Sequence, residues 1–289
     1  MDPADLLNRV NERHNTSFQL RGSLSGGYQE GSYEIVDLSG ISYVLKQTAT
    51  PRSLPIIEQL RGRGYRTPEF LLTGTTPEGT PYLIQEFAEG QPIERLTPGF
   101  VVQLLAQNRL QADLYEGETR PNGNWSDYAY NVVFHNESGW AECLRTYSPE
   151  TSRLMERLAE AAERYRSTPI PCTDAVHGDW SYGNLLTEDD RITAIVDCAY
   201  AGYGTRAIDL ASLLHYAYHN EDSGEITEPL RNEILSIGGV PLLTVLLIYR
   251  IMALVEFSVH HHGDDAVMAF VRSGEKIVEA LSALTYSSD

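Results

Sequence analysis

The first third of the chain alternates short apolar runs with turn residues, a pattern that predicts strands. The runs cover residues 32–38, 42–47, 69–72 and 82–87. Between the second and third runs, Ile56, Ile57 and Leu60 recur at helical spacing before Gly62 and Gly64 interrupt it. We therefore expect a small N-terminal sheet with one inserted helix over residues 55–63.

The pattern changes to helical periodicity near Pro98, after Gly90-Gln91-Pro92 has broken the strand pattern. A second helix is predicted from Pro149, a residue suited to the first helical position, to about residue 165. Residues 184–186 and 192–196 predict a hairpin, and residues 207–284 are mostly helical in pattern. These elements predict an α+β fold with an N-terminal lobe over 1–89 and a C-terminal lobe over 90–289.

Composition fits a globular protein of two lobes. The 289 residues are 42% hydrophobic and 21% charged, which excludes a mainly disordered or collagen-like chain. The most apolar stretch, residues 240–257, contains Arg250 and Glu256, which would be costly in a bilayer. We predict a buried helix there and no membrane partner.

The charge balance narrows the choice of ligands. Lys and Arg number 22 against 40 Asp and Glu, a net charge of −18, which disfavours nucleic acid and favours cationic ligands. Cys143, Cys172 and Cys198 show no disulfide or zinc-ligand spacing, so free, buried thiols are expected. The first residues show no secretory signal, and we expect a cytoplasmic protein.

The strongest chemical signal is the segment 177–184, His-Gly-Asp-Trp-Ser-Tyr-Gly-Asn, followed by Ile195-Val196-Asp197. The predicted hairpin can bring Asp179, Asn184 and Asp197 to one end. Hard oxygen ligands there suit Mg²⁺, and a free carboxylate can accept a proton from a hydroxyl group. This combination is typical of phosphoryl transfer, which depends mostly on positioning and charge neutralisation.

These segments resemble the HGDxxxxN and IxD motifs of aminoglycoside phosphotransferases and their choline-kinase and protein-kinase-like relatives. Asp209-Leu210-Ala211 resembles the DLA segment that follows them in that family. The resemblance implies a bilobal protein-kinase-like fold, with a small antiparallel-sheet N-lobe and a mainly helical C-lobe. It also implies that Asp179 is the catalytic base and that Asn184 and Asp197 are Mg²⁺ ligands.

The same resemblance implies that His177 and Asp209 support the catalytic loop. From the residues alone, His177 could equally be a core imidazole and Asp209 a helix N-cap.

A nucleotide donor needs a loop whose groups bind its phosphates. Ser25, Gly26 and Gly27 lie in a Ser/Gly-rich stretch where backbone N–H groups could approach phosphate oxygens, and we call this stretch the predicted phosphate cradle. Taken alone, this stretch is an ordinary hairpin turn. Lys46 ends an apolar strand, and Lys276 is the only other lysine. Kinase-like proteins use such a lysine on the α- and β-phosphates, and Glu58 is the candidate carboxylate to pair with it.

Residues 82–90 resemble the family's segment between the lobes, where backbone groups bind the nucleobase. Glu86 and Ala88 are therefore further nucleotide-binding candidates. Because backbone groups bind the nucleobase, the side chains of this segment do not indicate which base is bound. Both ATP and GTP therefore remain possible donors.

The acceptor pocket in such enzymes forms between the catalytic loop and the C-terminal helices. Aromatic and acidic residues in those regions are the substrate-binding candidates: Trp180, Tyr216, His219, Glu221, Asp222 and Glu256. Acidic residues around a pocket select cations, although an acidic surface also serves ordinary solubility. Glu256 would be costly inside an apolar helix unless paired, and Arg250 is one possible partner.

Together these features predict a Mg²⁺-dependent transferase, a kinase that moves the γ-phosphoryl group of ATP or GTP to a hydroxyl of a cationic antibiotic. Aminoglycosides come first, and tuberactinomycin-type peptides such as viomycin and capreomycin come second; the expected purpose is antibiotic resistance. The alternatives are a small-metabolite kinase acting on choline, an amino acid or a sugar, and a nucleotide-binding pseudokinase. The intact residues Lys46, Asp179, Asn184 and Asp197 argue against the pseudokinase. The sequence favours neither a monomer nor a dimer.

Overall fold

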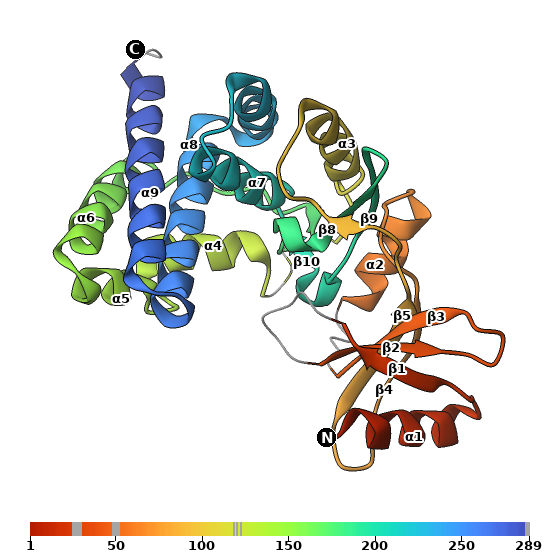
Figure 1. The fold of residues 1–289 in the computed structure, drawn as a ribbon. Helices are drawn as coiled ribbons and strands as arrows, with labels where there is room; N and C mark the ends of the chain where they lie inside the picture. Colours follow the sequence, from red (N-terminus) through yellow and green to blue (C-terminus); the bar gives the residue numbers. More distant parts are fainter. Residues whose placement is uncertain (25–30, 48–52, 118, 120, 122, 287–289) are drawn as a thin grey trace. The chain divides into compact units, whose positions relative to one another are not determined.

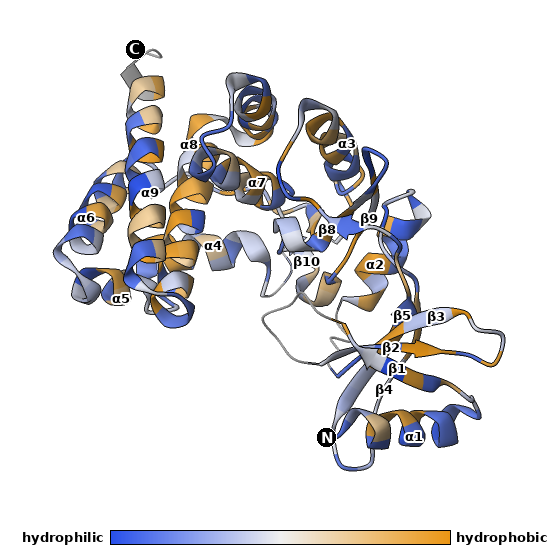
Figure 2. Ribbon diagram, in the orientation of Figure 1, coloured by the Kyte–Doolittle hydropathy of each residue, from blue (hydrophilic) through white to orange (hydrophobic). Residues whose placement is uncertain are grey.

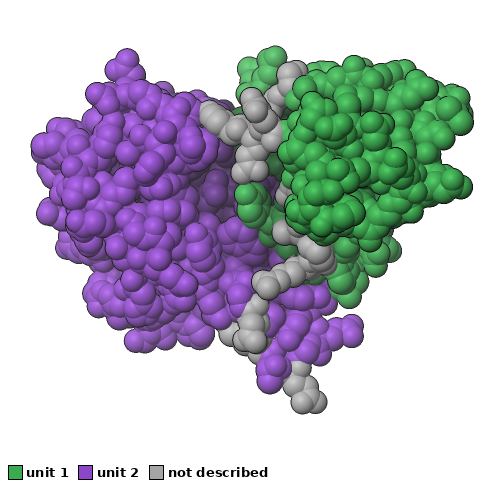
Figure 3. Space-filling model, turned by 90° about the horizontal axis from the view of Figure 1, so that it is seen from below, with its two compact units in different colours: residues 1–95, 181–201 green, residues 96–180, 202–289 purple. Residues whose placement is uncertain are grey.

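The computed structural model describes residues 1–24, 31–47, 53–117, 119, 121 and 123–286. The chain divides into two compact units, shown in different colours in Figure 3. Unit 1 contains residues 1–95 and 181–201, and unit 2 contains residues 96–180 and 202–289.

The main sheet of unit 1 is antiparallel and has the strand order β1-β2-β3-β5-β4 (Figure 1). Its strands are β1 (Gln19–Ser23), β2 (Ser32–Val36), β3 (Ser42–Lys46), β4 (Phe70–Thr75) and β5 (Pro81–Glu86). The four predicted strands are confirmed. Strand β1 was not predicted, because all of its residues are exposed and it shows no apolar alternation.

Two helices accompany this sheet. In α1 (Pro3–His14), Leu6, Leu7 and Val10 are buried in one core cluster with sheet residues that include Ile35 and Leu45. In α2 (Leu54–Gly62), the buried residues are Ile56, Ile57 and Leu60. These are the three positions whose spacing predicted this helix.

A second, smaller sheet in unit 1 contains β6 (Gln91–Pro92), β8 (Leu185–Glu188) and β9 (Arg191–Ile195), in the order β6-β8-β9. Strands β8 and β9 form the predicted hairpin. The amide of Ile93 donates to the carbonyl of Leu185 at 3.0 Å, so the hairpin is attached to the last residues of the first segment. For this reason residues 181–201 belong to unit 1, whereas the sequence had placed everything from residue 90 in one C-terminal lobe.

Unit 2 is mainly helical. Its helices are α3 (Pro98–Arg109), α4 (Trp125–His135), α5 (Trp140–Tyr147), α6 (Pro149–Glu163), α7 (Ala207–His219), α8 (Gly224–His261) and α9 (Asp264–Tyr286). Strands β7 (Asp174–Val176) and β10 (Gly202–Gly204) form one antiparallel pair beside them. Single short 3-10 turns at Tyr182–Asn184 and Cys198–Tyr200 belong to unit 1.

Helix α8 contains a long apolar stretch, and hydrophobic residues (orange) recur along it in Figure 2. Among the described residues it alone is long and apolar enough to cross a membrane by length and composition, and 72% of its most apolar window is buried inside the protein. The prediction of a buried helix over 240–257 is confirmed, since residues 242–252 are all buried. The helix is interrupted at Gly238 and at Gly239, whose φ of 68° lies in the left-handed region.

All three cysteines are free. Cys172 and Cys198 are buried as expected, whereas Cys143 on α5 is partly exposed.

Candidate functional site

The start of the catalytic-loop segment is fixed by one buried carboxylate in unit 2. Asp209, the third residue of α7, is fully buried. Its Oδ2 accepts from the amide of His177 at 2.8 Å and from Nε2 of Gln111 at 2.7 Å, and its Oδ1 accepts from the amide of Gly178 at 2.9 Å. Asp209 thus fixes the backbone directly before Asp179, which is more than a helix cap does.

Burial is the largest influence on Asp209 and raises the pKa of its carboxyl group, while the charge of His177 and the hydrogen bonds from Gln111, His177 and Gly178 oppose that rise. His177 is itself 1% exposed. Its Nδ1 accepts from the amide of Asp179 at 3.2 Å. The imidazole therefore touches the loop backbone from inside the core.

Gly178 must be glycine for two independent reasons. Its φ of 89° lies in the left-handed region, and a Cβ atom there would lie 2.5 Å from Cζ2 of Trp125. The indole of Trp125, the first residue of α4, therefore lies against the backbone one residue before Asp179. Neither Trp125 nor Gln111 was identified from the sequence, because contacts between residues so far apart leave no local pattern.

Asn184 and Asp197 lie at the same end of the β8–β9 hairpin in unit 1. The amide of Val196 donates to the carbonyl of Asn184 at 2.9 Å, and the next register pair is Leu185 with Ile195. Asp197 directly follows, with a left-handed backbone (φ 64°, ψ 50°) that Asp tolerates better than most residues. An amide oxygen and a carboxylate from adjacent positions are a donor set that fits Mg²⁺.

Lys46 lies at this same place. Its Nζ is 2.9 Å from Oδ1 of Asp197, and the Lys46 side chain is 12% exposed. The sequence predicted that Lys46 would pair with Glu58, and this pair is not formed in the described part of the chain. Glu58 is exposed on α2, since the buried face of that helix is occupied by Ile56, Ile57 and Leu60.

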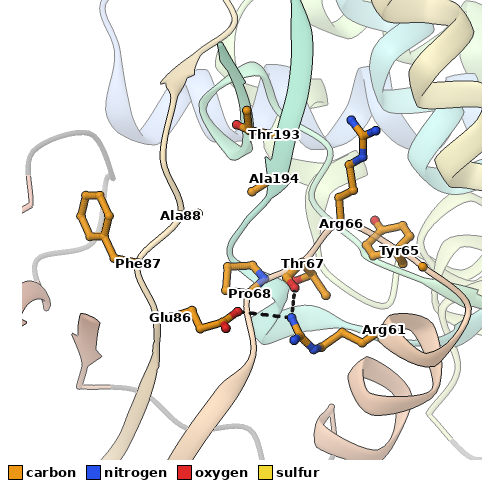
Figure 4. A pocket seen from close by; sticks show the side chains of 11 residues that line it. Arg61, Tyr65, Arg66, Thr67, Pro68, Glu86, Phe87, Ala88, Thr193 and Ala194 are labelled. Atoms are coloured by element: carbon orange, nitrogen blue, oxygen red, sulfur yellow. Dashed lines mark hydrogen bonds and ion pairs between the residues drawn. The ribbon is translucent and has the colours of Figure 1, made fainter. Parts of the chain in front are cut away.

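Residues 82–90, which resemble the family's segment between the lobes, are called the linker below. Two of them, Glu86 and Ala88, line a cavity of about 360 Å³ in unit 1. Figure 4 shows Arg61 reaching from α2 toward Glu86 and Thr67. The guanidinium of Arg61 lies 3.5 Å from Oε2 of Glu86, and it also donates to the carbonyl of Thr67. Lys46 and Asp197 are not among the lining residues, so this cavity is separate from the proposed phosphate contact.

The polar groups around the cavity tie the linker to the hairpin. Oγ1 of Thr193 donates to the carbonyl of Glu89 at 2.7 Å, and the amide of Ile195 donates to the carbonyl of Arg66 at 2.6 Å. Arg66 also donates to the carbonyl of Ile192. The linker, the α2–β4 connection and the hairpin with Asn184 and Asp197 are thereby held together within unit 1.

Ser25, Gly26 and Gly27, the predicted phosphate cradle, lie outside the described residues. The neighbouring strands β1 and β2 are described, and they pair from Gln19 with Val36 to Ser23 with Tyr33.

The acceptor candidates have different surroundings in unit 2. Trp180 is fully buried, which corrects its assignment as a substrate-binding residue. Its ring was taken as a pocket residue because it follows Asp179, but it belongs to the core. Tyr216 and His219 on α7 are partly exposed, and the ring of His219 stacks on Phe270 with centroids 4.3 Å apart.

The acidic candidates also differ. Glu221 is exposed and pairs with Lys276 of α9, which holds the pKa of Glu221 below its usual range. Asp222 is partly buried, and its amide donates to the carbonyl of Ala217. Glu256 lies 3.3 Å from Nδ1 of His260, and the described ion pairs include none between Glu256 and Arg250.

Solved structures share this fold. A thermostable mutant of aminoglycoside phosphotransferase APH(4)-Ia in its apo form is 18% identical with a TM-score of 0.68, covering 94% of this chain and 98% of that chain. An asparagine-to-alanine variant of that thermostable mutant, in a ternary complex with AMP-PNP and hygromycin B, has the same identity and TM-score, with coverages of 93% and 96%. The GDP complex of wild-type aminoglycoside 2'-phosphotransferase-IIIa is 14% identical with a TM-score of 0.66, covering 97% of this chain and 99% of that chain.

The comparison with curated proteins gave no match. The family model described as the phosphotransferase enzyme family matches residues 23–234, which contain the strand with Lys46, the catalytic-loop segment and the hairpin. The chain therefore belongs to the phosphotransferase enzyme family and is a small-molecule phosphotransferase of the aminoglycoside phosphotransferase type.

Proposed function

We propose that the chain transfers the γ-phosphoryl group of ATP or GTP to a hydroxyl group of a cationic antibiotic and so inactivates it. An aminoglycoside is the first candidate, and a tuberactinomycin-type peptide such as viomycin or capreomycin is the second. The observation that carries the proposal is the Lys46–Asp197 pair, 2.9 Å apart, at the hairpin end that also carries Asn184. A cation and oxygen ligands in one place suit the phosphates of a Mg²⁺–nucleotide complex.

In this proposal each residue has a separate role. Lys46 binds the α- and β-phosphates, and its ammonium is held by Asp197 until a nucleotide enters. Asn184 and Asp197 would hold Mg²⁺, which neutralises phosphate charge when bound. Asp179 orients the acceptor hydroxyl and accepts its proton.

The arrangement of the loop supports the role of Asp179. The amides of the two residues before it donate to Asp209, and its own amide donates to His177. The backbone that carries the base is therefore held before any substrate binds, which reduces the cost of positioning it in the transition state.

Two observations support a cationic acceptor and a nucleotide donor. The net charge of −18 attracts cations over distances comparable with the Debye length. Structures with the same fold were solved with AMP-PNP and hygromycin B, or with GDP. We extend the nucleotide donor and the cationic acceptor to this chain as part of the proposal.

The test is a coupled assay of ATP and GTP consumption with aminoglycosides, capreomycin, viomycin, choline and amino acids, with Mg²⁺ and with EDTA. We expect turnover with at least one cationic antibiotic, abolished by EDTA and restored by added Mg²⁺. Binding of that acceptor should weaken as salt rises. Turnover only with choline or an amino acid would support the metabolite kinase instead. Tight nucleotide binding without any turnover would support the pseudokinase.

A further inference from the structure

Four aromatic side chains from three helices of unit 2 form one continuous cluster. Trp125 and Tyr128 come from α4, Trp140 from α5 and Tyr249 from α8. Tyr128 contacts the other three, with ring centroids 5.7 Å from Trp125, 6.3 Å from Trp140 and 6.1 Å from Tyr249. The rings of Trp140 and Tyr249 are 5.8 Å apart and inclined by 34°. We call these four residues the aromatic cluster.

The aromatic cluster begins at the catalytic loop. The indole of Trp125 lies so close to Gly178 that a Cβ atom there would be 2.5 Å from it. Tyr249, at the other side of the cluster, is within electrostatic reach of Asp179: burial raises the pKa of Tyr249, and the charge of Asp179 adds to that rise. The cluster and the proposed base therefore lie side by side in the same unit.

The cluster is not a closed core. Tyr249 is 4% exposed, but Trp125, Tyr128 and Trp140 are each partly exposed. The remaining tryptophan, Trp180, is completely buried. Partly exposed aromatic rings beside a catalytic carboxylate provide apolar surface and ring faces to whatever molecule is bound there.

A carboxylate continues the cluster along α8. Glu256 follows Tyr249 by seven residues, which corresponds to about 10 Å along a helix. On α5, Cys143 follows Trp140 by three residues and lies near Glu256: burial raises the pKa of the Cys143 thiol, and the charge of Glu256 adds to that rise. Along the contact between α5 and α8, the rings of Trp140 and Tyr249 thus lie toward Asp179 at one end and Glu256 lies at the other. We call this line of residues the α5–α8 seam.

From this arrangement we infer that the acceptor lies along the α5–α8 seam, with its hydroxyl at Asp179, its body on the aromatic cluster and a cationic group at Glu256. The inference rests on the proposed function and narrows the acceptor class. Ring faces attract cations, and planar guanidinium groups stack on them as well. We therefore assign the site to an acceptor that carries, besides the phosphorylated hydroxyl, a guanidinium or ammonium group that reaches Glu256, about 10 Å along α8 from Tyr249.

The experiment removes the exposed rings and measures the acceptor and nucleotide parameters separately. We expect Tyr128→Leu and Trp140→Leu each to raise the acceptor KM by about tenfold, with the nucleotide KM unchanged and kcat within about threefold. Trp140→Phe should restore most of the loss. Tyr130→Leu is the matched control, because Tyr130 is on the same helix as Tyr128 but contacts Phe134 and His135, and its hydroxyl donates to the carbonyl of Arg166.

Glu256 provides a second variant that leaves the rings in place. Glu256→Gln should raise the acceptor KM and flatten its dependence on salt, because one charge-assisted contact becomes neutral. If Trp140→Leu and Glu256→Gln both leave the acceptor KM unchanged in an enzyme that turns over, the seam is not the acceptor site, although the proposed function stands.

Direct binding separates the two proposals when no acceptor is turned over. Tryptophan fluorescence of the wild type is titrated with capreomycin, kanamycin and choline chloride. A saturable change with capreomycin or kanamycin whose Kd rises about tenfold in Tyr128→Leu, a variant that keeps every tryptophan, supports the seam, even if the catalytic proposal fails. The absence of any saturable change in the wild type overturns the seam as a cation site.

Discussion

The Nζ atom of Lys46 lies 2.9 Å from Oδ1 of Asp197, although the two residues are 151 positions apart in the chain. Lys46 ends β3, and Asp197 follows β9, so the pair joins the two sheets of unit 1. The Lys46 side chain is 12% exposed and that of Asp197 is 42% exposed. An enclosed cation beside an accessible carboxylate is what the phosphates of a Mg²⁺–nucleotide complex need.

Replacing Lys46 should weaken the nucleotide and not the acceptor. We expect Lys46→Met to raise the KM for the nucleotide about tenfold or more, because the substitution removes the only cation in contact with Asp197 among the described ion pairs. Steady-state kinetics over a range of nucleotide concentrations measures this.

The matched control is Lys276→Met, at the only other lysine. Lys276 pairs with Glu221 at the surface of unit 2 and should not affect the nucleotide KM. Equal nucleotide KM values for Lys46→Met and the wild type would refute the phosphate contact.

Asp179→Asn should reduce kcat by at least about a hundredfold, since it removes a base and leaves the shape of the side chain. The nucleotide Kd, measured by calorimetry, should stay within about threefold. Asp189→Asn, at an exposed position in the β8–β9 turn, is the control and should keep full activity. Wild-type turnover in Asp179→Asn would remove this residue from the mechanism.

The metal requirement should depend on Asn184. We expect Asn184→Leu to raise the Mg²⁺ concentration for half-maximal activity by about tenfold or more, because an oxygen ligand is lost from the hairpin end. A titration of Mg²⁺ at fixed nucleotide measures this. Should the half-maximal concentration stay the same, Asn184 is not a ligand.

Removing the Asp209 carboxylate should destabilise the protein as well as the catalytic loop. Asp209→Ala leaves three buried donors without their acceptor, on His177, Gly178 and Gln111, at about 1–3 kcal/mol each. We expect the free energy of unfolding in urea to fall by about 3 kcal/mol or more. Asp265→Ala, at an exposed position in the first turn of α9, should change it by less than about 1 kcal/mol. A similar small change in Asp209→Ala would show that the buried network is not needed.

Periodicity along the sequence predicted the local elements well. The buried residues Ile56, Ile57 and Leu60 identified α2, and alternating runs identified four strands. Helices α1, α4 and α5 were not predicted. Helix α4 is rich in aromatic and β-branched residues, which are typical of strands as well.

The candidate site was predictable where the motif was contiguous. The segment 177–184 and Asp197 lie on the loop and hairpin that the spacing indicated. The partner of Lys46 was misassigned to Glu58, which is the only acidic residue between Lys46 and Glu69 but lies on the exposed face of α2. Gln111 and Trp125 could not be found, since their relation to residues 177–209 arises only from tertiary packing.

The buried imidazole of His215 should make stability depend on pH. Burial, and then the charges of Arg250 and His219, lower the pKa of His215 from 6.5 to about 3. Since the folded pKa lies below the unfolded one, the contribution of the neutral ring to stability is complete above pH 6.5 and is lost progressively as the pH falls toward about 3. This residue alone should lower the free energy of unfolding by about 1.4 kcal/mol per pH unit in that window.

His215→Phe tests this dependence. Neither ring nitrogen of His215 has a hydrogen-bond partner in the described protein, so an apolar ring of similar shape should cost little at pH 7.5. Between pH 6.5 and pH 4.5 the variant should lose less stability than the wild type, as measured by urea unfolding at each pH. The exposed His135, replaced by Phe, should leave the wild-type slope unchanged. Identical slopes in His215→Phe and the wild type would contradict the assignment.

Unit 1 is made from two stretches of chain, and this has a consequence for how the protein is synthesised. Its first 95 residues leave the ribosome long before residues 181–201, which supply β8, β9 and the anionic partner of Lys46. Bringing residues 181–201 back to residues 1–95 costs conformational entropy before the stabilising strand pairs and contacts have formed. This cost slows folding. The second sheet of unit 1 must therefore wait, with β6 unpaired and the ammonium of Lys46 without its anionic partner, until residues 96–180 of the helical unit have been translated.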